Sequence, residues 1–293
     1  MTLQETSTVE VAAAKSTLRR FWRGFVCSLS FLVLPMGRLC CGRWIKRMEP
    51  ERLDRGLVLI LPGIEGRSFL NVSLLAGLLD SGLPYAMEIV DWTTGCPLLG
   101  IYHLRAWERN RRVACQIAGR VVEYRRKYPG RPVWLIGHSA GGAMSLLTAE
   151  YLPAEESLTG IVLLAPAMSS RYSCDAAMQR TERGIWNFYS AGDVWLLGLG
   201  TLLFGTFDGV HWPGSGCIGF AHRTNPLPAA ECQLRQIPYR LGMISQFNLG
   251  GHFGCVHRVF VAETIGPILL ANVGDGEKRR QAETQHTIPE SAH

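Results

Sequence analysis

A serine at position 139 lies in the pattern Gly137-His138-Ser139-Ala140-Gly141, which has the spacing G-x-S-x-G. In this pattern the serine stands on a sharp turn, where its hydroxyl can attack a carbonyl carbon. The two glycines lack the Cβ atoms that would collide inside such a turn. Because five residues match by chance in many chains, the flanking sequence decides what the pattern means.

That flanking sequence predicts a strand before the serine and a helix after it. Val133 to Ile136 is a continuous apolar run, typical of a strand buried on both faces. A helix is predicted to begin near Gly142 and to stop before Pro153. Its N-terminus would favour negative charge developing beside Ser139. A glycine-rich turn with an incidental serine is the alternative, and the context favours a nucleophile.

Strand and helix alternate over most of the chain. The chain has 293 residues, of which 47% are hydrophobic, enough for one large domain with short extensions. The alternation predicts an α/β fold, with a mostly parallel central sheet and helices on both faces. Further strands are expected at 57–61, 85–90, 161–164 and 185–189, and further helices at 71–79, 104–128 and 254–265.

With this elbow and the matching elements around it, the chain resembles the α/β-hydrolase superfamily over roughly residues 56–270. The resemblance implies an oxyanion-hole loop at Leu61-Pro62-Gly63-Ile64-Glu65-Gly66. Many members have His-Gly where this chain has Pro62-Gly63, but the donors are backbone N–H groups, so the change need not matter. The expected donors are the N–H groups of Ile64 and Ala140, each contributing about 3 kcal/mol to transition-state stabilisation. An ordinary strand-ending turn is the alternative.

The resemblance also implies a catalytic triad in the chain order Ser, then Asp or Glu, then His. Asp193 comes just past the strand predicted at 185–189 and is the expected acid, with a helix N-cap as its alternative role. Asp175 and Asp208 are its rivals. The expected base is His252, because the family's histidine occupies a loop before the last helix, as Gly250-Gly251-His252-Phe253-Gly254 does.

Besides His252, five histidines follow Asp193 in the chain. His211 and His222 lie in a segment rich in glycine and proline and stay open as alternative bases. His257 is expected inside the last helix, pointing elsewhere, and His286 in the tail. His138 is interpreted as a neighbour of the nucleophile rather than as the base.

The stretch between Asp193 and His252 is longer than one connection and one helix require. Its first part is apolar and interrupted by glycine, which predicts a lid over 194–235 or an acyl-binding wall, with an extra core helix as the alternative. The expected domains are an N-terminal basic and apolar segment at 1–50, the hydrolase domain at 51–272 and a polar tail at 273–293.

The N-terminal segment indicates contact with a membrane surface. Residues 1–16 are expected to be mobile, and 24–37 carry no charge but are flanked by basic residues. Such a run is shorter than the roughly 20 residues that span a bilayer, so an interfacial anchor is favoured, with a secretory signal and a core helix as alternatives. The side chains expected in the interface are Phe25, Leu29, Phe31, Leu32 and Leu34.

The composition of the chain limits which classes of binding partner and which cellular compartment are expected. The net charge of +6 comes without an aromatic-interleaved nucleic-acid motif, so a membrane surface is favoured over nucleic acid. The nine cysteines are scattered and show no metal-type spacing, so no zinc site is expected and a reducing compartment is weakly favoured. A membrane-associated or cytoplasmic location is expected, with export by an N-terminal signal as the alternative.

Together these features predict a serine hydrolase that cleaves a carboxylic ester through an acyl-enzyme on Ser139, in the manner of an esterase or lipase. The expected substrate is a small-molecule or lipid-like ester, with no cofactor. Three alternatives stay open. They are an acyltransferase with the same triad, a haloperoxidase or lyase on the same fold, and a non-catalytic membrane-associated protein that keeps the fold.

Overall fold

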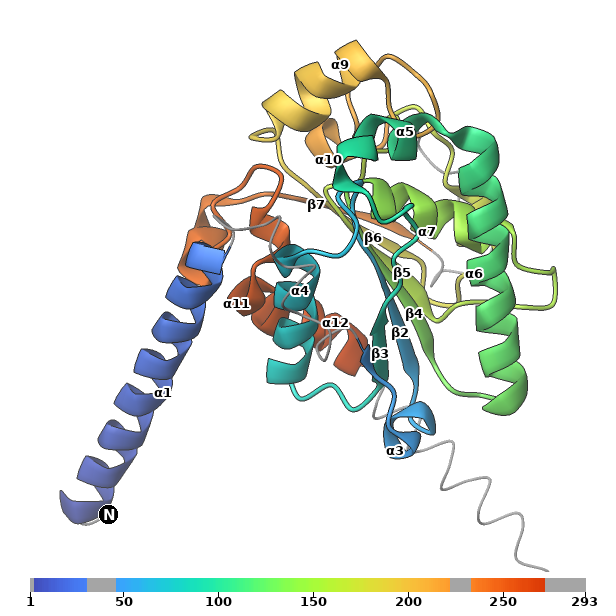
Figure 1. The fold of residues 1–293 in the computed structure, drawn as a ribbon. Coiled ribbons are helices and arrows are strands. Elements are labelled where there is room, and N and C mark those ends of the chain that lie inside the picture. Colours follow the sequence, from blue (N-terminus) through green and yellow to red (C-terminus); the bar gives the residue numbers. More distant parts are fainter. Residues whose placement is uncertain (1–2, 31–45, 222–232, 272–293) are drawn as a thin grey trace, which may run out of the picture.

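A seven-stranded sheet forms the centre of the computed structural model, which describes residues 3–30, 46–221 and 233–271 (Figure 1). The strand order is β1-β3-β2-β4-β5-β6-β7, in which β1 runs antiparallel to β3 and all other neighbours are parallel. The strands are β1 (Lys46–Arg47), β2 (Leu57–Leu61), β3 (Ala86–Ile89), β4 (Val133–His138), β5 (Gly160–Leu164), β6 (Ile185–Tyr189) and β7 (Leu234–Pro238). The predicted mostly parallel sheet is confirmed.

Helices cover both faces of this sheet. Figure 1 shows α6 (Trp107–Lys127) and α7 (Ala140–Glu150) on one side, and α4 (Phe69–Asp80), α11 (Arg258–Phe260) and α12 (Gly266–Leu270) on the other. Every residue of β2, β4 and β5 is buried between these layers, as their uninterrupted apolar runs predict. The chain therefore has the predicted α/β architecture.

Short helical segments complete the chain. They are α3 (Pro50–Leu53), η3 (Pro97–Leu99), α5 (Gly100–Arg105), α8 (Asp175–Met178), η4 (Val194–Gly200), α9 (Thr201–Phe204), α10 (Ser215–Ile218), η5 (Leu241–Gln246), η6 (Gly254–Val256) and η7 (Val261–Ile265). Figure 1 shows α5, α9 and α10 gathered beyond one end of the sheet. Residues of α5 and α9 line the cavity of the candidate site.

Two predicted helices are divided in the structure. The helix expected over 104–128 breaks at Ala106, whose ψ of 64° separates α5 from α6. Asn110 Nδ2 donates to the His103 carbonyl at 2.7 Å, which satisfies an acceptor at the end of α5. The helix expected over 254–265 is split into η6, α11 and η7, with His257 in extended backbone before α11. Neither break falls on a proline or glycine, so the sequence pattern did not show it.

Helix α1 (Leu3–Ser30) packs one side of its last turns against the domain. Arg20 pairs with Glu263, and the Gly24 carbonyl accepts a hydrogen bond from His257 Nε2 at 3.1 Å. Burial lowers the pKa of His257 to about 4, so its ring is neutral at ordinary pH and can make this contact without burying a charge. Of the segment at 1–16 that was expected to be mobile, residues 3–16 belong to α1, and residues 1–2 lie outside the described residues.

The other side of α1 is apolar and exposed. Its side chains are between 43% and 62% exposed and belong to Phe21, Trp22, Phe25, Val26 and Leu29. Phe31, Leu32 and Leu34 of the expected anchor lie outside the described residues. Within the described ranges, no helix combines the length and the apolar character needed to cross a bilayer.

Candidate active site

The turn between β4 and α7 holds Ser139 at a positive φ of 55°, with ψ at −124°. Such backbone geometry is costly for a residue other than glycine and persists only where the surroundings fix it. Here the Ser139 N–H donates to the Leu164 carbonyl, and the Ala167 N–H donates to the Ser139 carbonyl, both at 2.9 Å. A Cβ on Gly137 would lie 2.2 Å from the carbonyl oxygen of Gly141, so the turn requires glycine there. Ser139 thus stands between a strand and a helix, as expected.

Asp193 and His252 form a close pair. Asp193 follows β6 after a short turn, and His252 lies in the loop before η6. His252 Nδ1 donates to Asp193 Oδ2 at 2.6 Å, and the two side chains are 9% and 1% exposed. Asp193 Oδ1 accepts the Leu197 N–H at 3.3 Å, so this carboxylate also caps η4, the alternative role considered for it. The carboxylate fixes the ring proton on Nδ1 and leaves Nε2 free to accept one.

The rival acids serve local structure instead. Asp175 is the first residue of α8. Asp208 Oδ1 accepts hydrogen bonds from the Ser169 N–H at 3.0 Å and from the Thr206 hydroxyl at 2.6 Å. Neither carboxylate lines the cavity that contains Ser139.

The rival bases are not brought to Ser139 within the described residues. His211 is exposed, and its Nδ1 donates to the Leu202 carbonyl at 3.0 Å. His257 was expected inside the last helix, but it caps α11 and binds α1. His222 and His286 lie outside the described residues. Of the histidines after Asp193 that the structure describes, His252 alone lines the same cavity as Ser139.

His138 supports the His252 loop from within the protein. It is fully buried, and its Nε2 donates to the His252 carbonyl at 2.9 Å. Burial, and to a smaller extent the neighbouring His252, lowers the pKa of His138 to about 3. The ring is therefore neutral at ordinary pH and fixes a backbone carbonyl, which agrees with its interpretation as a neighbour rather than a base.

A cavity of about 720 Å³ lies over Ser139 and His252. Cavities of this size hold a small ligand or an acyl chain. Most of the side chains that line it are apolar, and these are Ile64, Leu70, Ile101, Leu104, Ala167, Trp195, Leu196, Leu197, Leu199, Leu203, Phe204 and Phe253. Much of η4 and α9, within the predicted lid at 194–235, forms one wall of the cavity. The last two lid positions belong to β7, and residues 222–232 lie outside the described residues.

Ala140 and Ile64 carry the two backbone N–H groups that were expected to bind the oxyanion. Ala140 begins α7, and Ile64 lies in the turn after β2 and lines the cavity together with Ser139. Neither N–H is hydrogen-bonded to another described residue. Neither donor is thus occupied within the described residues, and the N-terminus of α7 has a dipole that favours nearby negative charge. Ser139 Oγ and His252 are likewise not hydrogen-bonded to each other among the described atoms, and such bonds often tighten only on substrate binding.

Glu65 also lines the cavity, although its role was not predicted. Its carboxylate lies beside Gly63, and the Ser68 hydroxyl donates to Oε1 at 3.3 Å. Burial raises the pKa of Glu65, opposed in part by the N–H groups of Glu65 and Gly63 and by His252 and Ser68. A raised pKa favours the neutral acid, which would oppose an oxyanion less than a carboxylate would. Its position directly after the predicted oxyanion donor Ile64 was the available signal.

Cysteines and other residue types that could bind a metal are dispersed in the described part of the chain. Cys27, Cys174, Cys217 and Cys255 are buried free thiols. Burial, and to a smaller extent Asp193, raises the pKa of the Cys255 thiol, which disfavours the reactive thiolate. Among the described residues, no three His, Cys, Asp or Glu side chains gather where they could hold a metal ion.

Comparison with protein families agrees with the fold. The model described as "Alpha/beta hydrolase family" matches residues 58–275 of this chain. The chain belongs to the alpha/beta hydrolase family. The matched range contains Ser139, Asp193 and His252. A comparison with curated proteins gives no match.

Solved structures of hydrolases resemble the chain at low identity. Esterase PE8 is similar at 14% identity over 74% of this chain and 92% of its own, with a TM-score of 0.43. Esterase B from Lactobacillus Rhamnosis is similar at 14% identity over 95% and 97%, with a TM-score of 0.41. The LpqC poly(3-hydroxybutyrate) depolymerase from Bordetella parapertussis is similar at 12% identity over 78% and 85%, with a TM-score of 0.46. At such scores the family assignment rests on the family match and the fold.

Proposed function

We propose that this hydrolase-family protein cleaves a carboxylic ester through an acyl-enzyme on Ser139. The main support is the 2.6 Å hydrogen bond between His252 Nδ1 and Asp193 Oδ2, in a pair whose histidine lines the same cavity as Ser139. The order of the three residues is the one expected in the family. Turnover of chromogenic esters together with labelling by a fluorophosphonate tests the proposal, and a folded protein that does neither would refute it.

Acylation follows from these positions. His252 Nε2 takes the proton from Ser139 Oγ as that oxygen attacks the ester carbonyl carbon. The carbonyl oxygen becomes an oxyanion, which accepts hydrogen bonds from the N–H groups of Ile64 and Ala140. Asp193 stabilises the imidazolium through Nδ1. The tetrahedral intermediate collapses, the imidazolium returns its proton to the departing alkoxide, and the alcohol leaves.

Deacylation reverses the proton path. A water molecule attacks the acyl carbon while His252 Nε2 takes its proton, and a second tetrahedral intermediate forms on the same two donors. The Ser139–acyl bond then breaks, and Ser139 Oγ recovers a proton from the imidazolium. The products are a carboxylic acid, an alcohol and the free enzyme.

The apolar walls of the cavity favour an apolar acyl group. Leu199 lines the cavity and is 45% exposed, so a larger side chain there can occupy cavity space with little effect on folding. We expect Leu199→Trp to lower kcat/KM for octanoate and longer esters by about tenfold or more, because a few methylenes of contact are worth that much. Acetate and butyrate esters should be hydrolysed at nearly the original rate. The measurement is a panel of p-nitrophenyl esters of increasing chain length.

Leu202→Trp is the matched control for this change. Leu202 lies on the next helix, α9, is 42% exposed and does not line the cavity. Its chain-length profile should equal that of the wild type. An unchanged profile for Leu199→Trp, or equal losses in both variants, would show that the acyl group binds elsewhere.

We further propose that the exposed side of α1 rests on an anionic membrane. Trp22 and Phe25 stack on each other with ring centroids 5.8 Å apart and are 62% and 43% exposed, with the basic Arg19 and Arg23 nearby. We expect the double variant Trp22→Ser, Phe25→Ser to bind phosphatidylserine vesicles about tenfold less tightly or weaker, because each apolar side chain contributes about 1.5–3 kcal/mol of burial. Activity on short soluble esters should not change.

Co-sedimentation with vesicles at low and high salt measures the membrane binding of the wild type and of the double variant. Wild-type binding should weaken at high salt and on neutral phosphatidylcholine vesicles, because basic residues act through the surface potential. Equal sedimentation of wild type and double variant would refute the anchor. Tight binding that ignores salt would instead show insertion of the helix.

A further inference from the structure

All three carbonyl oxygens around the expected oxyanion donor are held by hydrogen bonds. The Pro62 carbonyl accepts from Trp92 Nε1 at 2.7 Å, and the Gly63 carbonyl accepts from the Gly66 N–H at 3.1 Å. The Ile64 carbonyl and His103 Nδ1 are 2.9 Å apart. Two of these partners are buried ring nitrogens that come from outside the loop. Trp92 is 2% exposed and His103 is 0% exposed.

The proton on His103 is placed by its other partner. The Thr94 N–H donates to His103 Nε2 at 3.2 Å, so Nε2 presents a lone pair. The ring proton is therefore on Nδ1, which donates it to the Ile64 carbonyl. The Thr94 hydroxyl also lies 2.8 Å from Nε2, and Asn110 Nδ2 holds the His103 backbone carbonyl at 2.7 Å. The hydrogen bonds of His103 thus fix the orientation of its ring, so that Nδ1–H points at the Ile64 carbonyl.

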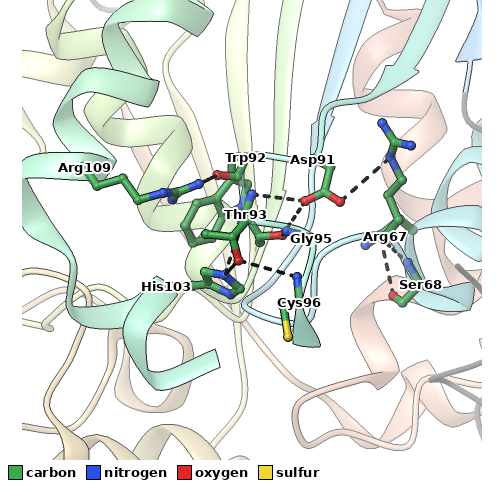
Figure 2. A network of polar contacts seen from close by, with 11 residues as sticks. Arg67, Ser68, Asp91, Trp92, Thr93, Gly95, Cys96, His103 and Arg109 are labelled. Atoms are coloured by element: carbon green, nitrogen blue, oxygen red, sulfur yellow. Dashed lines mark hydrogen bonds and ion pairs between the residues drawn. The ribbon is translucent and has the colours of Figure 1, made fainter. Parts of the chain in front are cut away.

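Trp92 lies in the loop that follows β3, and a residue of α6 holds its backbone. Figure 2 shows Arg109 reaching the Trp92 carbonyl, and the distance from its Nη2 to that oxygen is 2.7 Å. Beside Trp92, the Asp91 carboxylate accepts from the Thr93 N–H at 3.1 Å and from the Thr93 hydroxyl at 2.6 Å, and faces Arg67 (Figure 2). The segment 91–93, which contacts the oxyanion loop through Trp92, is therefore held by several hydrogen bonds and an ion pair.

We infer that Trp92 and His103 are positioning residues that hold the Ile64 N–H in place for the oxyanion. They hold the carbonyls on both sides of the Gly63–Ile64 peptide, and the Gly66 N–H holds the carbonyl of that peptide itself. The two rings therefore anchor the ends of the short turn whose central peptide carries the Ile64 N–H. A donor that is oriented before the reaction needs no reorganisation when charge develops, and a small misplacement is costly. The inference rests on the proposed ester hydrolysis, but neither ring touches the reacting atoms in it.

Trp92→Phe tests the first positioning residue, because phenylalanine keeps an aromatic ring and lacks the indole N–H. Trp134→Phe is its matched control, since Trp134 is also fully buried but its Nε1 has no hydrogen-bond partner among the described residues. We expect Trp92→Phe to lower kcat by about tenfold or more with KM within about twofold, because the loss falls on the transition state. Trp134→Phe should keep kcat within about twofold of wild type.

His103 gives an independent test by rescue. Asn places its Nδ2 near the position of His Nδ1, so His103→Asn keeps a donor for the Ile64 carbonyl, whereas His103→Leu fills space without one. We expect His103→Leu to lose about tenfold or more in kcat and His103→Asn to recover most of it, with similar melting temperatures in both. A purely structural role would give equal losses in both variants, or changes that follow stability.

These outcomes separate the inference from the proposed function. If Ser139→Ala is inactive but Trp92→Phe behaves like Trp134→Phe and the His103 variants match wild type, the positioning role is wrong and the hydrolase stands. If Ser139→Ala keeps its turnover, the proposed function itself fails. A fall in kcat at unchanged KM in Trp92→Phe and His103→Leu, together with rescue by His103→Asn, supports the inference.

Discussion

Replacing Ser139 by alanine is expected to abolish fluorophosphonate labelling and to lower kcat for ester hydrolysis by about 10⁴-fold or more. The reason is that no acyl-enzyme can form without Ser139 Oγ. The fold should survive, because alanine tolerates such a backbone in this chain, as Ala165 does at φ 47°. Steady-state kinetics and gel labelling measure the effect, with circular dichroism to verify folding.

Ser170→Ala is the control for the loss of a serine hydroxyl. Ser170 is fully buried, its Oγ has no hydrogen-bond partner among the described residues, and it does not line the cavity. Its kcat should stay within about twofold of wild type. Turnover retained in a correctly folded Ser139→Ala protein would exclude Ser139 as the nucleophile.

His252→Ala is expected to be about as damaging as Ser139→Ala, because nucleophile and base act as a unit. Asp193→Asn should be roughly a hundredfold less severe, since the imidazole stays but its tautomer is poorly fixed. An asparagine side chain can still accept the Leu197 N–H, so the cap of η4 should remain and the loss can be assigned to His252. The measurement is kcat/KM on one soluble ester for each variant.

His211→Ala is the matched histidine control. His211 is exposed and contacts the Leu202 carbonyl rather than the cavity. It should retain kcat within about twofold of wild type. If His211→Ala destroys activity while His252→Ala does not, the base has been assigned to the wrong histidine.

The elements around Ser139 could be predicted because their signals are local. An apolar run, a glycine-flanked serine and a helix follow one another directly, and β4 and α7 adjoin Ser139 as that order requires. The contact between Asp193 and His252 spans 59 positions, and only the chain order and the element positions implied by the family resemblance predicted it. Their geometry at 2.6 Å is a property of the packed structure.

The helix breaks and the edge strands of the sheet could not be predicted from local sequence signals. Ala106 has no unusual side chain, and the break there depends on tertiary bonds such as that from Asn110 to His103. The edge strand β7 was missed because it is only partly buried and lacks a continuous apolar run. The two-residue strand β1 is too short to give any periodic pattern.

The roles proposed for Trp92 and His103 also lie beyond sequence reasoning. Their partners in the oxyanion loop are 30 and 39 positions away, and neither residue belongs to a recognisable motif. A buried histidine or tryptophan usually just packs in a core. Only the paired distances to the Pro62 and Ile64 carbonyls distinguish these two rings.

Mass spectrometry of the protein after reaction with a fluorophosphonate tests the proposed chemistry most directly. The intact mass should increase by one phosphonyl adduct per chain, and peptide mapping should place that adduct on Ser139. The adduct should be absent from Ser139→Ala and should form much more slowly in His252→Ala, because the base activates the hydroxyl. An adduct on another residue, or ester turnover by a protein that takes up no adduct, would contradict an acyl-enzyme on Ser139.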